Sequence, residues 1–433
     1  MKLLRRLLIC LLLLQLAPLS PAQTPSPAPA AAAIVPDIPS TADPATATRA
    51  WLDTVPADKR AKSDAYFEGG YWLILWNFLL AAAISVLLLG TRLSARIRDF
   101  AERATRFKSM QVAIYAVAYV LLISLLEFPL VVYEKFFREH AYGLATQTFG
   151  PWFSERLVET GIDLVASTIL VVILYAVFRR APKSWWLWGP AVVIFFFTIG
   201  ILIAPIYIEP LFNKYKTLTN PALSEPILAM AQANQIPVRQ VFEVDASRQS
   251  NRVSANVGGF LGTTRIALND NLLQQCTLAE IRYVMAHEMG HYVLNHIAKY
   301  LVSLSLIVLI SFALTKTLFQ AAVRRWGDRW QVRGIADPAG LPLLMLIFGV
   351  ISFLLTPVNN TITRVAEVEA DAFGINTSRE PTGMAQVALK LGTYRKLDPT
   401  PLEEFIFFDH PSGRARIRMA MDWKAAHLPA RGE

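Results

Sequence analysis

Long apolar runs separated by short basic segments dominate the pattern of hydrophobic and polar positions along this chain. The apolar runs lie near residues 71–90, 112–132, 161–178, 185–208, 300–319 and 341–357. A helix that crosses a membrane needs about 20 apolar residues, so each run is a candidate transmembrane helix, with 161–178 and 341–357 the shortest. We therefore predict a four-helix transmembrane region in 66–208 and two further spans in 300–357.

Two polar stretches, 209–299 and 358–433, interrupt and follow these spans. Short strands are expected in the first stretch, at 240–245, 254–261 and 264–268. A helix is expected to start at Thr277, because Thr is a favourable N-cap and Glu280 stands three residues on, which is the capping-box spacing. The predicted fold is mainly α: a polytopic transmembrane helix bundle that carries a small α+β subdomain built from the two polar stretches.

The N-terminus has the pattern of a targeting segment. In 1–22, basic residues precede an apolar core, and the small residues Ser20 and Ala22 follow it. This pattern is typical of a secretory signal peptide, and an uncleaved signal anchor is the alternative. Residues 23–65 begin with an Ala- and Pro-rich sequence that is typical of a flexible tether.

Composition supports the membrane class. The chain is 54% hydrophobic and only 17% charged, whereas soluble domains are about 45–50% apolar and about 25% charged. The net charge of +9 is carried by short segments between apolar runs, so nucleic-acid binding is not expected. The expected partners are the lipid bilayer and a peptide or protein substrate. The sequence leaves the oligomeric state open.

Loop charge predicts the orientation in the membrane. Arg and Lys residues concentrate in three loops, 91–111, 179–184 and 320–340. With six spans these loops share one face, and the positive-inside rule makes that face cytoplasmic. The polar stretches then face outward, so we expect an integral protein of the bacterial inner membrane with its catalytic region in the periplasm.

The strongest chemical motif is His287-Glu288-Met289-Gly290-His291. Positions i and i+4 share one face of a helix, so both imidazoles can reach one zinc ion, at about 2.0–2.1 Å. Glu288 is rotated by roughly 100° and can act as general base on the water that zinc acidifies. The motif predicts a metalloprotease that holds one Zn²⁺ per chain.

A catalytic zinc site needs a third protein ligand and an open position. Glu367 is the best candidate, and Asp371 stands four residues on, where it can orient a ligating histidine. From the residues alone an acidic helix is more often a solvated face. Glu369, between them, points to another side and is expected to be solvated or structural. His296 is expected to have a structural or supporting role.

Several motifs in this order resemble the integral-membrane CAAX prenyl endopeptidases and their bacterial relatives, which are zinc metallopeptidases of the HEXXH gluzincin type. The matching segments begin at Glu139, Pro210, Asn256, Ala286, Arg364 and His410, and the resemblance covers nearly everything from residue 66 onward. It implies that His287, His291 and Glu367 bind zinc and that Asp371 supports them. It also implies that His410 stabilises the oxyanion and that Asn256 binds substrate, and we predict a substrate contact for Arg416 in the same C-terminal motif.

The predicted function is a membrane-embedded zinc-dependent metalloendopeptidase. The alternative is a non-catalytic membrane scaffold or chaperone that keeps zinc for structure, which an intact Glu288 disfavours. An intramembrane protease is a third interpretation, but Arg282, Asn295 and Lys299 flank the zinc helix and fit it poorly. The resemblance implies a site that faces the cytoplasm, whereas loop charge places it outside.

Overall fold

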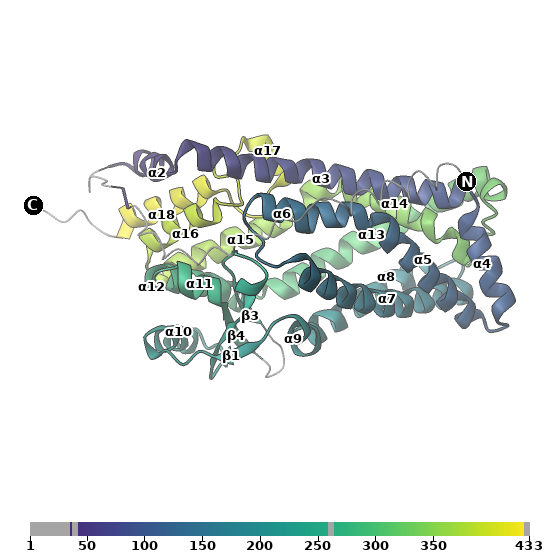
Figure 1. The fold of residues 1–433 in the computed structure, drawn as a ribbon, viewed down its shortest axis with the longest axis horizontal. Helices are drawn as coiled ribbons and strands as arrows, with labels where there is room; N and C mark the ends of the chain where they lie inside the picture. The colour runs from purple at the N-terminus through teal and green to yellow at the C-terminus, as the bar shows by residue number, and fades with distance from the viewer. Residues whose placement is uncertain (1–34, 37–41, 259–263, 428–433) are drawn as a thin grey trace, which may run out of the picture. The chain divides into compact units, whose positions relative to one another are not determined.

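The structure is a computed structural model that describes residues 35–36, 42–258 and 264–427 (Figure 1). The expected signal segment 1–22 lies outside the described residues, as does the end of the strand expected over 254–261.

Five helices of the described chain are long and apolar enough to cross a membrane. They are α3 (Ala57–Gly90), α5 (Lys108–Val132) continued by η2 (Tyr133–Phe137) and α6 (Arg138–Ala141), α7 (Phe149–Arg180), α8 (Trp185–Ile203) continued by η3 (Ala204–Ile208) and α9 (Glu209–Phe212), and α13 (His296–Trp330). At most 22% of the most apolar window of any of them is buried inside the protein. Apolar side chains that face outward over such lengths fit a lipid environment.

The sixth predicted span is a bent pair of helices. The first, α14 (Leu341–Leu354), is only about 21 Å long at 1.5 Å per residue, which is short of the roughly 30 Å hydrocarbon core. After it, α15 (Thr356–Ser378) turns away by 54°. The predicted number of six membrane spans holds if the pair forms one broken span. The C-terminal half of α15 then belongs to the polar part of the protein.

The spans pack through one apolar cluster. It contains large buried side chains of α3, α5, α7, α8, α13 and α14, among them Leu88, Tyr115, Phe178, Trp185 and Phe312. The short helix α4 (Leu93–Ala104) closes one end, where buried Arg98 forms an ion pair with Asp337, 2.7 Å away, beside η5 (Pro338–Gly340). This contact joins the segment after α3 to the segment after α13.

A four-stranded sheet lies in the polar stretch before α13 (Figure 1). Its order is β1-β2-β4-β3, with β1 (Tyr215–Thr217), β2 (Val241–Val244), β4 (Arg265–Asn269) and β3 (Ala255–Gly258). Only β2 and β4 are parallel, and β3 is an edge strand. Side chains of α10 (Pro221–Ala233), α11 (Asp270–Gln275) and α12 (Leu278–Val293) share a core with the sheet. The strands predicted at 240–245 and 264–268 are confirmed, as is the described part of the strand predicted over 254–261, whereas β1 was not predicted.

The flexible tether predicted over 23–65 is wrong from residue 44 onward. Residues 44–53 form α2 (Pro44–Asp53), capped by Asp43, and α3 already begins at Ala57. Trp51 is only 2% exposed. It packs in a cluster with α16 (Pro381–Leu391) and α18 (Gly413–His427), which flank α17 (Pro401–Phe407) in the sequence. The short helix η4 (Ala246–Arg248) lies apart from them, between β2 and β3. Burial against helices far along the chain orders a segment whose local composition favours disorder.

Truncation of Trp51 tests this contact. Trp51→Ala should lower the stability of the C-terminal helices by about 3 to 5 kcal/mol, because it removes a large buried ring. The measurement is the thermal unfolding midpoint of the purified protein. Trp72→Ala is the matched control, because that ring is 63% exposed on a span. Equal, small shifts for both variants would contradict the packing of α2.

Candidate metal centre

Two histidines of α12 line up on one face of the helix. The helix starts with the predicted capping box, in which Thr277 accepts from the Glu280 backbone and Glu280 accepts from the Thr277 backbone. The Nε2 atoms of His287 and His291 lie 3.2 Å apart. Both rings therefore turn the same nitrogen to one point, which confirms the geometry expected from the i, i+4 spacing.

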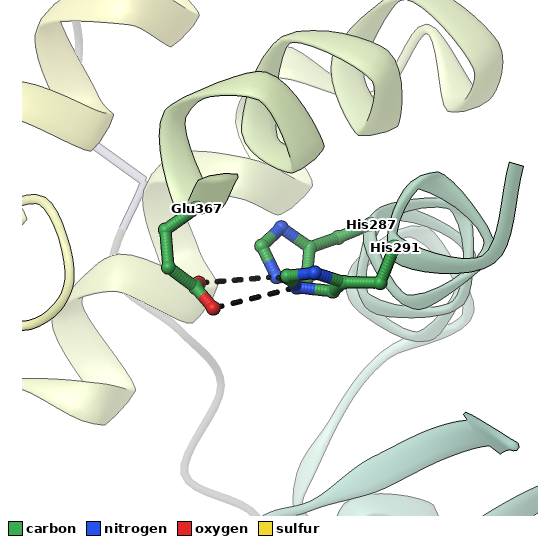
Figure 2. Close-up of side chains that lie close together, drawn as sticks. All are labelled: His287, His291 and Glu367. Atoms are coloured by element: carbon green, nitrogen blue, oxygen red, sulfur yellow. Dashed lines mark hydrogen bonds and ion pairs between the residues drawn. The ribbon is translucent and has the colours of Figure 1, made fainter. Parts of the chain in front are cut away.

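A carboxylate from α15 completes the group (Figure 2). Oε2 of Glu367 lies 3.4 Å from Nε2 of His287, and Oε1 lies 3.4 Å from Nε2 of His291. Ligands at about 2.0–2.1 Å in a tetrahedral shell stand roughly 3.3 Å from one another, so the spacing suits a small divalent cation. Two imidazoles and one carboxylate are also one of the donor sets that catalytic zinc sites use.

The charges at this point favour a cation. Burial alone would lower the pKa of His287, but the nearby carboxylates, above all those of Asp371 and Glu367, outweigh burial and raise this pKa to about 10. The surrounding carboxylates thus favour positive charge between the rings and Glu367, which fits a metal ion at this position.

Small residues allow α12 and α15 to approach this closely. A Cβ added at Gly374 would lie 3.1 Å from Cα and N of His287, and one at Gly290 would lie 3.3 Å from Cα of Ala370. Such distances leave almost no room for a side chain in place of either glycine. The two glycines therefore set the separation at which one ion can be shared.

His287 is oriented by a buried carboxylate. Its Nδ1 lies 2.9 Å from Oδ1 of Asp371, which is fully buried. The hydroxyl of Tyr283 donates to the same carboxylate oxygen, at 2.8 Å, and Nε of Arg416 donates to its other oxygen, also at 2.8 Å. A carboxylate behind a ligating imidazole fixes the ring and raises its basicity, which is the role predicted for Asp371.

His291 is oriented by a second histidine. Its Nδ1 lies 2.8 Å from Nδ1 of His296, whose Nε2 lies 3.0 Å from Oε2 of Glu369. A metal on Nε2 of His291 leaves the proton on Nδ1, so His291 donates to His296 and His296 donates to Glu369. Glu369 also pairs with Lys299. Sequence reasoning expected a supporting role for His296 but did not identify its partners.

Glu288 lines the same cavity, of about 310 Å³, as the three candidate ligands. Burial raises the pKa of Glu288 above its ordinary value. A carboxylate with a raised pKa is better suited to take up a proton.

The structure brings His410 to the site and places the other two predicted substrate contacts differently. Nε2 of His410 lies 3.4 Å from Oε1 of Glu367, and its Nδ1 lies 2.7 Å from Oδ1 of Asp409. Asn256 is exposed on the edge strand β3, next to Ala255 in the cavity wall. Arg416 is buried, and Nη2 contacts Oε2 of Glu367 at 3.1 Å. Its guanidinium thus holds two carboxylates of the site.

Comparisons with known proteins agree with this fold. The family model described as CAAX prenyl protease N-terminal, five membrane helices, matches residues 43–214, and the model of peptidase family M48 matches residues 217–424. The metalloprotease YhfN of Bacillus subtilis is 32% identical over 337 residues, which cover 77% of this chain and 78% of the relative. CAAX prenyl protease 1 of Saccharomyces cerevisiae is 26% identical over 320 residues, 70% of either chain.

The solved structure of S. mikatae Ste24p has the same fold, with a TM-score of 0.72 at 20% sequence identity, over 86% of this chain and 90% of that one. The matching family models, the membrane-length helices and a candidate His/Glu metal site together define a membrane metallopeptidase of the CAAX protease type. The chain belongs to peptidase family M48.

Asp371 should control metal affinity. Asp371→Asn removes the charge behind His287, so metal affinity should fall by about 10- to 100-fold. Competition with a chelator of known affinity, read out as metal content of the purified protein, measures the change. Asp422→Asn is the control, because that carboxylate is exposed and its one ion pair within the described part of the chain is with Arg418. Unchanged affinity in Asp371→Asn would show that this carboxylate does not support the ligand.

Proposed function

We propose that this protein is a zinc-dependent metalloendopeptidase, with His287, His291 and Glu367 as zinc ligands. The observation that carries the proposal is the spacing of their three ligand atoms, which all lie within 4.8 Å of one another beside the buried carboxylate of Glu288. A structural zinc site closes its fourth position with protein, whereas here a cavity opens beside the three ligands.

The chain's own residues supply the proton transfers. Bound zinc provides Lewis acidity toward water and a peptide carbonyl. Glu288 accepts the proton of the water that attacks the carbonyl, and it then donates this proton to the leaving amine. His410 donates from Nε2 to the oxyanion, and its Nδ1 contact with Asp409 keeps the ring in place. Asp371 and Arg416 hold His287 and Glu367 in position.

The substrate is proposed to add to the sheet as a strand. β3 is an edge strand of the described sheet, and its first residue, Ala255, lines the catalytic cavity together with the two preceding residues, Val253 and Ser254. An extended peptide can pair with such an edge through backbone hydrogen bonds, and Asn256 can contact it from the same strand. This arrangement favours peptide segments in an extended conformation.

The catalytic end is proposed to face the periplasm. Residues from all three basic loops line one cavity, namely Arg98, Lys108, Arg179 and Arg333. The metal ligand His291 contacts His296 at the first residue of α13, which ends at Trp330, about 52 Å away at 1.5 Å per residue. The basic loops and the site thus belong to opposite ends of this span, and the positive-inside rule places the basic end in the cytoplasm. We therefore propose peptides or proteins reached from outside as substrates.

Glu288→Gln tests catalysis. The variant should retain its metal but lose peptide cleavage by a factor of at least about 10², because proton transfer contributes on that order. Cleavage of a quenched fluorescent peptide and metal content are measured on the same purified protein. Glu225→Gln, on the exposed face of α10, is the control. Equal cleavage by the wild type and Glu288→Gln would favour the scaffold alternative.

Reporter fusions test the orientation. A reporter inserted in the loop 179–184 should be active only in its cytoplasmic form, and one after the C-terminal residue 433 only in its exported form. The reason for this expectation is the excess of Arg and Lys in the loop 179–184, which the positive-inside rule places in the cytoplasm. A cytoplasmic tail would reverse the proposed orientation without affecting the chemistry of the site.

A further inference from the structure

Two cavities of the catalytic region share a wall at Tyr394 and Arg395. The first is the cavity of the candidate metal site, of about 310 Å³, and the second, of about 410 Å³, lies toward α3. Arg395 stands in the segment that follows α16, outside any helix. Its side chain is therefore part of the surface that a substrate in the catalytic cavity would meet.

The guanidinium of Arg395 has no anionic partner among the residues that the structure describes. Its Nη1 atom is buried and makes no hydrogen bond there, and no described carboxylate lies within 4.0 Å of the side chain. The other arginines of these two walls each have a carboxylate partner, which Arg395 lacks among the described residues. Arg416 pairs with Asp371 and Glu367, and Glu139 pairs with Arg252 at 2.7 Å and with Arg138 at 3.9 Å.

The backbone around Arg395 is held in place by its neighbours. The guanidinium therefore does not lack a partner because its segment is loosely packed. The hydroxyl of Ser63 on α3 donates to the carbonyl oxygen of Arg395 at 3.2 Å. The next residue, Lys396, forms ion pairs with Glu68 on α3 and with Glu403 on α17. The ammonium group of Lys396 thus has two carboxylate partners, whereas the guanidinium of Arg395 faces the cavities.

A buried cation without a counter-charge is unfavourable. Burial and the nearby Arg416 guanidinium lower the pKa of Arg395, and the carboxylates of Asp409 and Glu367 oppose this only from beyond ion-pair distance. A guanidinium presents paired N–H donors that match the two oxygens of a carboxylate. A carboxylate that entered the cavity would supply the missing hydrogen bonds and charge.

We propose that Arg395 forms a subsite that binds a carboxylate of the substrate within a few residues of the scissile bond. The carboxylate comes either from an Asp or Glu side chain or from the C-terminus of the peptide. The subsite rests on the proposed peptidase function, because it assigns a specificity to that same cavity. Arg395 acts on substrate selection and not on proton transfer.

Matched peptide pairs test the subsite on the full-length metal-loaded protein. Quenched peptides of one sequence carry Glu or Gln at each of three positions on either side of the scissile bond. A further pair ends close to this bond with a free or an amidated C-terminus. For one carboxylate, kcat/KM should exceed that of the neutral counterpart on the order of tenfold, mainly through KM. The pair that shows the preference identifies the source of the carboxylate.

Variants then assign the preference to Arg395. Arg395→Gln should remove it, Arg395→Lys should keep part of it, and Arg414→Gln should keep all of it, because that arginine is exposed and pairs with Asp398. A wild type that cleaves both members of every pair equally overturns the subsite, as does a preference that survives Arg395→Gln. If Arg395→Gln does not fold, an undiminished preference in Arg395→Lys overturns it.

Failure of the subsite and failure of the proposed function are separable. Binding of the same peptide pairs to Glu288→Gln is measured by fluorescence anisotropy, without any need for turnover. Tighter binding of the carboxylate peptide without cleavage by the wild type supports the subsite and contradicts the peptidase. Cleavage by the wild type together with equal binding within every pair supports the peptidase and contradicts the subsite.

Discussion

The close packing of α12 on α15 is the constraint on which the site depends. Two imidazoles of one helix and a carboxylate of another can share an ion only if their ligand atoms come within about 3.3 Å of one another. Gly290 and Gly374 permit this, since a Cβ at either would crowd the facing helix. Interiors are close-packed and resist displacement, so the spacing of the helices fixes the spacing of the ligands.

Pairing with opposite charges explains why the carboxylates of Glu367 and Asp371 can stay buried. Glu367 and Asp371 are 6% and 0% exposed, and two carboxylates in such surroundings are costly unless each is paired. Arg416 pairs with both, and the hydroxyl of Tyr283 donates to Asp371. The network leaves the other oxygen of Glu367 directed to the imidazole of His291. Arg416 thus counters the repulsion between carboxylates on one helix face and keeps Glu367 directed at the metal position.

Local patterns predicted the local features of this protein. The apolar runs, three of the four strands and the capping box of α12 are confirmed, because each follows from residues close together in the sequence. Contacts between segments far apart in the sequence were harder to predict. The residues alone made Glu367 the best candidate for the third ligand but favoured a solvated helix face, and the family resemblance then favoured the ligand role. The partners of Arg416 and the burial of Trp51 depend on helices that fold against them from far along the chain.

The membrane spans are parts of the catalytic region and not merely its anchor. α13 begins at His296, which contacts the candidate ligand His291, and Asn295 makes the turn between the two helices with a φ of 55°. α3 reaches the region from another side, where Ser63 and Glu68 hold the segment that carries Arg395. A ligand's orientation and a cavity wall are therefore both tied to the ends of transmembrane helices. A tilt of either span would move the candidate ligand His291 or the cavity wall at Arg395, so the geometry of the candidate site depends on how these spans are held.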